Sequence, residues 1–188
     1  SLDEVVRFHE KKMPLPDFSY SITFDDGFEN NYTVAKPILE RLSIPATFYV
    51  STNLVDKNLM TWIDQIEYCI DKIDKETFEL PWSKTFFKVL SNETKIEFLN
   101  ILRKNIKKDP INYSPNKIVR YIYKKCGMKL ITSSNGPLDK KMNWKQLSVL
   151  HNHKLFSIGG HSHNHVSLAQ LKQEKMKLEI QKSIKLLK

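Results

Sequence analysis

Two short stretches of the sequence carry side chains that could bind a metal ion or move a proton. Asp25 and Asp26 stand side by side in I-T-F-D-D-G-F, and His161, His163 and His165 lie in G-G-H-S-H-N-H. Carboxylate and imidazole together suit zinc, cobalt or nickel. Two adjacent carboxylates repel each other, and a divalent cation bound by one of them relieves that repulsion. The other carboxylate is then free to take a proton from a water molecule on the metal.

Both clusters follow a predicted strand. Residues 20–24 are apolar, aromatic and β-branched and end at an Asp-Gly turn, and residues 155–160 end in two glycines. Residues 44–51 predict a further strand, and the helical pattern of residues 30–42 lies before it, so a parallel βαβ unit is expected. Sites in parallel α/β folds lie at the carboxyl ends of strands. We therefore expect the acids and the histidines to meet at one edge of the sheet, although they are far apart in the sequence.

Helices account for most of the remaining chain. In residues 30–42, Val34, Ile38 and Leu42 form an apolar stripe with Ala35 and Leu39 beside it, and Pro37 predicts a kink or a late helix start. A small hairpin is predicted from residues 77–80 and 85–90. The other predicted helices span residues 2–8, 61–73, 91–106 (capped by Ser91), 114–126, 143–152 (opened by an Asn143–Gln146 capping box) and the segment from a Ser167–Gln170 capping box to Lys188.

The composition indicates one globular domain. The chain has 188 residues, 40% of them hydrophobic and 27% charged, with a formal net charge of +9. The lysines fall at the polar positions of amphipathic helices, which is the pattern of a solvated face rather than of a nucleic-acid interface. No apolar run reaches the roughly 20 residues of a membrane span. Cys69 and Cys126 fit no metal or redox spacing, and we expect two thiols, with a disulfide between them left open.

The motifs resemble those of a known enzyme family. The segments I-T-F-D-D-G-F, I-P-A-T-F-Y-V-S-T and I-G-G-H-S-H-N-H-V-S-L, in this order, resemble the polysaccharide deacetylase (NodB-homology) family, also called carbohydrate esterase family four. The resemblance extends from about residue 2 to the end of the chain. It implies that Asp25 is the general base and that Asp26, His161 and His165 hold one divalent metal ion. Zinc is the expected metal, with cobalt or nickel as alternatives.

The resemblance also implies a fold and a reaction. We expect an α/β domain over residues 1–188 that forms part of a distorted (β/α) barrel, incomplete at both ends, with a mainly helical insertion over residues 61–142. The implied reaction is the metal-dependent removal of N-acetyl groups from an amino sugar of a polysaccharide, peptidoglycan or lipopolysaccharide precursor. The histidine acid and the oxyanion motif of the family are not found in this sequence, so slow turnover is expected. No signal peptide is visible, and a cytoplasmic or cell-envelope location in a bacterium is expected.

Several alternatives stay open. His163 lies between the two expected ligands, and His161 with His163 could be the pair instead. The chain could be an O-acetyl esterase of the same family or a catalytically silent glycan-binding domain, and nucleic-acid binding through the basic helices ranks lowest. Trp62 and Asp64 resemble a sugar-facing segment of some homologues, but a helix with a buried Trp is the favoured interpretation. The oligomeric state and the substrate-binding residues are not predicted.

Overall fold

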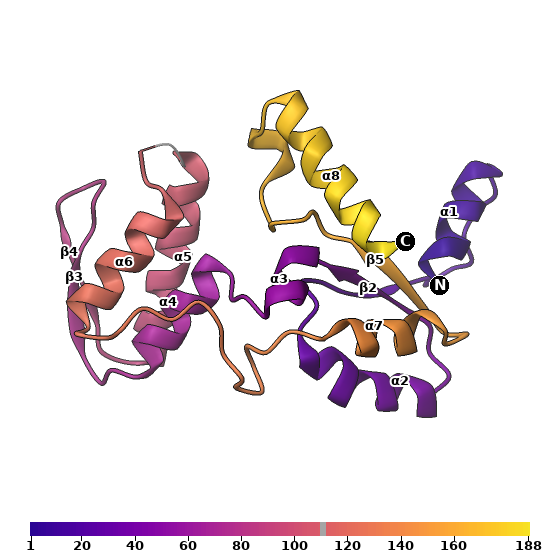
Figure 1. The fold of residues 1–188 in the computed structure, drawn as a ribbon, viewed down its shortest axis with the longest axis horizontal. Helices are drawn as coiled ribbons and strands as arrows, with labels where there is room; N and C mark the ends of the chain where they lie inside the picture. Colours follow the sequence, from indigo (N-terminus) through magenta and orange to yellow (C-terminus); the bar gives the residue numbers. More distant parts are fainter. Residues whose placement is uncertain (110–111) are drawn as a thin grey trace. The chain divides into compact units, whose positions relative to one another are not determined.

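The computed structural model describes residues 1–109 and 112–188, which form two units (Figure 1). The first unit comprises Ser1–Leu59 and Ser133–Lys188, and the second comprises Met60–Thr132. The two clusters of acids and histidines both belong to the first unit. The second unit interrupts the first in the sequence.

The first unit contains an open, three-stranded parallel sheet. Its strands are β1 (Ile22–Phe24), β2 (Ala46–Val50) and β5 (Phe156–Gly160), in the order β1-β2-β5. Strand β2 is central and almost entirely buried, as expected for a parallel strand covered on its faces. The predicted parallel βαβ unit is confirmed, because β1 pairs in parallel with β2. All three carboxyl ends therefore lie at the same edge of the sheet.

Helices surround this sheet. They are α1 (Leu2–Glu10), the π-helical turn η1 (Asn31–Ala35), α2 (Lys36–Arg41), α3 (Thr52–Lys57), α7 (Trp144–His151), the 3-10 turn η2 (Leu168–Gln170) and α8 (Gln173–Leu187). In Figure 1, α2 and α7 lie side by side, and Leu39 of α2 shares a buried cluster with Leu147 and Leu150 of α7. Phe48 of β2 stacks on Phe24 of β1 at the centre of this cluster. Among the described residues, no helix is both long and apolar enough to cross a membrane.

The helical segment after β1 differs from the expected regular helix. Leu39 is 6% exposed, whereas the three residues of the predicted apolar stripe, Val34, Ile38 and Leu42, are 44–56% exposed. The prediction of this stripe depends on a uniform helical period of 3.6 residues, but the segment opens with the wider π-helical turn η1. Pro37 has no amide proton to donate to the preceding turn, which accounts for the wider turn and for α2 beginning at that point.

The start of the last helix was also predicted wrongly. Ser167 makes no capping hydrogen bond with its side chain, and residues 168–170 form only the 3-10 turn η2. Leu171 then adopts an extended backbone, with φ −93° and ψ 149°, which interrupts the helical path. Helix α8 begins at Gln173, after Lys172, so the capping-box spacing at Ser167 and Gln170 does not mark a helix start. By contrast, the Asn143–Gln146 capping box of α7 is formed as predicted.

The second unit has its own hydrophobic core. It contains α4 (Trp62–Asp71), the hairpin strands β3 (Glu76–Glu79) and β4 (Phe86–Val89), α5 (Asn92–Lys108) and α6 (Pro115–Lys125). The antiparallel hairpin and the Ser91 cap of α5 are confirmed. Asp64 belongs to a capping box with Thr61, which accounts for it without a sugar ligand. Cys69 and Cys126 are free thiols. The buried side chains that fill this core include Ile66, Ile70, Phe78, Phe98, Leu102 and Ile122.

Candidate metal centre

A tight turn directly after β1 carries the two acids. The amide of Gly27 donates to the carbonyl of Asp25 over 2.9 Å, and Asp26 and Gly27 adopt left-handed backbones with φ of 70° and 80°. A Cβ atom on Gly27 would lie 2.9 Å from Cγ2 of Val55 and 3.2 Å from Cγ1 of Val50. Glycine is therefore required for both its conformation and its size. The turn sends the neighbouring carboxylates of Asp25 and Asp26 into different surroundings.

The loop after β5 carries the histidines. The amide of His161 donates to the carbonyl of Val50 over 2.9 Å, and Ser51 Oγ donates to the carbonyl of His161 over 2.8 Å. Ser162 and His165 both adopt left-handed backbones, with φ of 59° and 54°. Such conformations are uncommon outside glycine and persist only where the surroundings hold them in place. The loop thus curls so that its first and last histidine lie close together.

The two loops meet at Asp26. Its Oδ1 lies 3.0 Å from Nε2 of His165 and 3.6 Å from Nε2 of His161. One ligand atom from each of these residues lies within 4.8 Å of the others, and no second group of three such side chains occurs among the described residues. The side chain of Asp25 is exposed and makes no hydrogen bond or ion pair with any residue that the structure describes.

The three side chains fit a divalent metal ion. Oδ1 of Asp26 is buried but has no partner in hydrogen-bonding geometry, although two imidazole nitrogens lie near it. Tetrahedral zinc with bonds of 2.0–2.2 Å separates its ligand atoms by about 3.3–3.6 Å. The observed separations of 3.0 and 3.6 Å lie close to that range. Three protein ligands would leave a coordination position open, as in catalytic zinc sites.

The electrostatic environment keeps Asp26 ionised. Burial raises the pKa of its carboxyl group, but the contact with His165 and the positive charges of His161 and Lys141 outweigh burial. The net result is a pKa below the ordinary value of 3.8. The carboxylate therefore carries its charge at neutral pH, which is the form that binds a metal.

His163 points to a different element. Its Nδ1 lies 2.9 Å from Oγ1 of Thr52 at the start of α3, and its carbonyl accepts from the amide of Asn53 over 2.9 Å. It does not belong to the group formed by Asp26, His161 and His165. In this structure His163 ties the histidine loop to α3.

Asn164 is a residue of the site that the sequence interpretation missed. Its Oδ1 accepts from Nδ2 of Asn53 over 2.9 Å. Its amide and its Nδ2 donate to the two carboxylate oxygens of Glu179, over 2.9 and 2.6 Å. The loop is therefore held from α3 on one side and from α8 on the other. The only signal in the sequence was an amide side chain between two candidate ligands, which did not identify its partners.

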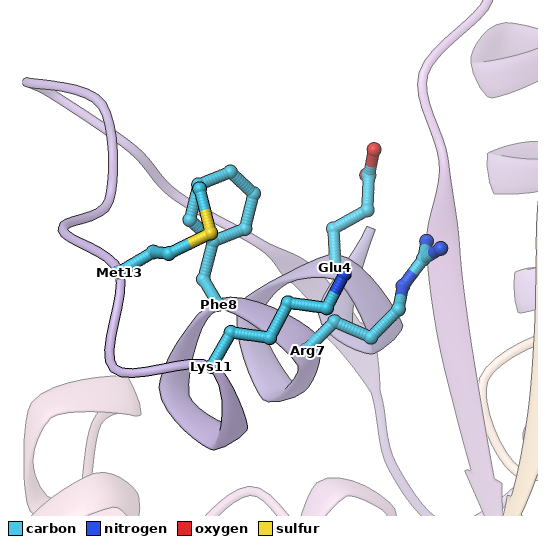
Figure 2. A pocket seen from close by; sticks show the side chains of 5 residues that line it. All are labelled: Glu4, Arg7, Phe8, Lys11 and Met13. Carbon is cyan, nitrogen blue, oxygen red and sulfur yellow. The ribbon is translucent and has the colours of Figure 1, made fainter.

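Other features of the first unit bring no such group together. His153 lies 3.2 Å from Oε1 of Glu40 and stacks on Phe156, and His151 is exposed at the end of α7. Figure 2 shows a pocket lined by apolar and charged side chains of α1 and the turn after it. Its composition offers neither paired ligands nor a base beside a nucleophile. The residues that line it are Glu4, Arg7, Phe8, Lys11 and Met13.

Fold and site together define a class of protein. A parallel α/β sheet with an Asp and two His at its carboxyl edge is the arrangement of an α/β protein with a candidate metal site. The sequence model of the polysaccharide deacetylase family matches residues 12–188, so the chain belongs to that family. Membership implies a deacetylase hydrolase in general and is consistent with a carbohydrate substrate. A search of curated proteins returned no match to the chain.

Proposed function

We propose that this chain carries the catalytic centre of a metal-dependent deacetylase that removes N-acetyl groups from an amino sugar of a polysaccharide, peptidoglycan or lipopolysaccharide precursor. The observation that supports this most is the convergence of Asp26, His161 and His165, with Asp25 exposed beside them, in a member of this family. Asp26 and the two histidines would hold the ion. Zinc is proposed because two imidazoles and one carboxylate suit it, with cobalt or nickel as alternatives.

Asp25 is proposed as the general base. A bound divalent ion would supply a Lewis acid for the acetyl carbonyl and for a water molecule. The Asp25 carboxylate would accept a proton from the attacking water as the water oxygen bonds to the carbonyl carbon. The bond between the carbonyl carbon and the nitrogen would then break as the nitrogen takes up a proton from solvent, and acetate and the free amine of the sugar are the products. The exposed position of Asp25 leaves its carboxylate accessible to water and to a substrate.

The larger architecture is proposed on the same basis. We propose that the first unit is part of a distorted (β/α) barrel domain spanning residues 1–188, with a mainly helical insertion over residues 61–142. The three parallel strands support the barrel proposal. The bond from the amide of Met60 to the carbonyl of Thr132, 2.9 Å long, supports an insertion that begins near residue 61, although residues 133–142 group with the first unit. A cytoplasmic or cell-envelope location is part of the proposal.

Calorimetric titration of zinc into the chelator-stripped chain tests the site. One-to-one binding is expected, and Asp26→Ala and His161→Ala should each weaken it by about 100-fold or more. His151→Ala removes an exposed histidine of α7 and serves as the matched control, with an expected change of less than threefold. A folded wild-type chain that binds no zinc, cobalt or nickel would refute the proposed function.

Activity on two substrates tests the reaction. Acetate release from an N-acetylglucosamine oligomer supports the deacetylase, whereas release from acetylated xylan alone supports the O-acetyl esterase, since an ester needs no strong general acid. Asp25→Asn should retain metal affinity within about threefold and lose about 100-fold or more of the activity. An Asp25→Asn variant as active as the wild type would exclude Asp25 as the base.

A further inference from the structure

Lys141 is an unusual residue of the first unit. Among the residues that the structure describes, it is the one Lys, Arg, Asp or Glu that is fully buried, with 2% of its surface exposed. A lysine is almost never fully buried unless its charge is compensated, because removing an ammonium group from water is unfavourable. Its neighbour Lys140 has the same side chain but is 38% exposed. The burial of Lys141 therefore requires a reason that Lys140 does not share.

The backbone around Lys141 holds the turn that carries the acids. The amide of Met142 donates to the carbonyl of Gly27, and the amide of Glu29 donates to the carbonyl of Lys140, each over 2.8 Å. Between these two bonds, Phe28 and Lys141 form an isolated antiparallel bridge. Residues 27–29, directly after the acid pair, are thus paired with residues 140–142.

The side chain of Lys141 strengthens the same pairing. Its Nζ lies 3.3 Å from the centroid of the Phe28 ring, which is a close cation–π contact shielded from water. Its amide is fixed by Oδ1 of Asn58, at 2.9 Å. The ammonium group therefore helps to hold the shape of the turn.

We propose that Lys141 is a positioning residue of the metal centre: its buried ammonium group, against the Phe28 ring, fixes the Asp25–Asp26 turn before an ion binds. This inference rests on the proposed metal site. Lys141 does not contact the ion or the substrate in this role. It acts through Phe28 and the backbone of the turn.

Hydrogen exchange of the metal-free protein tests the positioning role without any metal. In the presence of chelator, Lys141→Met should increase the exchange rates of the Glu29 and Met142 amides about tenfold or more. Lys141→Arg keeps the charge and should restore them to within about threefold of the wild type. Lys154→Met, at an exposed lysine just before β5, is the control and should leave them within the same limit. Unchanged protection in a folded Lys141→Met protein would overturn the inference.

The phenylalanine gives a second, independent variant. Phe28→Leu retains the charge of Lys141 and removes the ring, and it should also increase exchange of the Glu29 amide by about threefold or more. If Lys141→Met does not fold, the inference is judged on this variant, and normal protection in Phe28→Leu would overturn it. Methionine fills a volume similar to that of lysine but carries no charge. If Lys141→Arg restores the protection that Lys141→Met loses, the charge and not the packing is responsible.

Titration with cobalt then tests the consequence for the ion. Lys141→Met should bind Co²⁺ about tenfold more weakly and change its visible absorption spectrum, whereas Lys141→Arg and the control Lys154→Met should match the wild type within about threefold. Tighter binding by Lys141→Met would overturn the inference, because it would mean that the lysine only competes with the ion. If the wild type itself binds no metal, the proposed function fails, and the positioning role is still decided by hydrogen exchange.

Discussion

Replacing Gly27 by alanine should disrupt the turn of the candidate site. The loss of unfolding free energy that this substitution causes can be worked out from the structure. A left-handed backbone costs an L-residue about 1–2 kcal/mol, and alanine recovers about 0.4–1 kcal/mol by restricting the unfolded chain. The added Cβ would also lie 2.9 Å from Val55 and 3.2 Å from Val50, both well packed. Overpacking of this kind costs about 1–3 kcal/mol. The Gly27→Ala variant should therefore lose about 2–4 kcal/mol of unfolding free energy.

Gly127 provides the matched control for this prediction. It also has a left-handed backbone, with φ 65°, but a Cβ there would meet no atom within 4 Å. Gly127→Ala should therefore lose only about 0.5–1 kcal/mol, from the backbone term alone. Denaturant unfolding of both variants and the wild type measures the difference. A loss for Gly27→Ala no larger than that for Gly127→Ala would refute the steric part of the reasoning.

Three further predictions follow from contacts elsewhere in the chain. Glu179→Gln and Asn164→Ala should weaken metal binding by about 10-fold, as is usual for residues that orient ligands, and calorimetry with zinc measures this. The pKa of Glu29 is lowered from 4.5, and the hydrogen bond from Lys140 is the largest cause. Glu29 therefore stabilises the fold above pH 4.5, and this stabilisation is lost as the pH falls through the lower pKa of the folded state. Glu29→Gln should therefore lower the melting temperature by about 1–2 °C at pH 7, and by progressively less as the pH is lowered below 4.5. Burial raises the pKa of Cys69 to about 12, so this thiol should resist iodoacetamide at pH 8 in the folded protein and react after unfolding, as peptide mass spectrometry would show.

Local signals in the sequence predicted many of the elements correctly. The Asn143 and Ser91 caps depend on residues three positions away, so their spacing contains the information that is needed. The same kind of signal failed at Ser167, where the chain turns and extends before the helix begins. The apolar stripe of residues 30–42 failed because Pro37 changes the helical period, and periodicity alone does not reveal such a change.

Contacts between distant parts of the chain could not be predicted in the same way. The juxtaposition of Asp26 with His161 and His165 could be expected because parallel strands align their carboxyl ends, which is a general rule of topology. No comparable rule links Asn164 to Glu179, since the register of α8 against the loop depends on where that helix begins. The difference between the two adjacent lysines, 140 and 141, is likewise a property of the folded chain.

The structure gives the two adjacent acids different surroundings through a single turn. The left-handed backbone of Asp26 directs its carboxylate to the histidines, where partial burial reduces screening by water and makes the neighbouring charges more effective. Asp25, one residue earlier, keeps its carboxylate in solvent. The proposed ligand and the proposed base therefore depend on the same backbone conformation but on different side chains. It follows that Asp26→Asn should remove metal binding alone, whereas a change at Gly27 should disturb the positions of both carboxylates together.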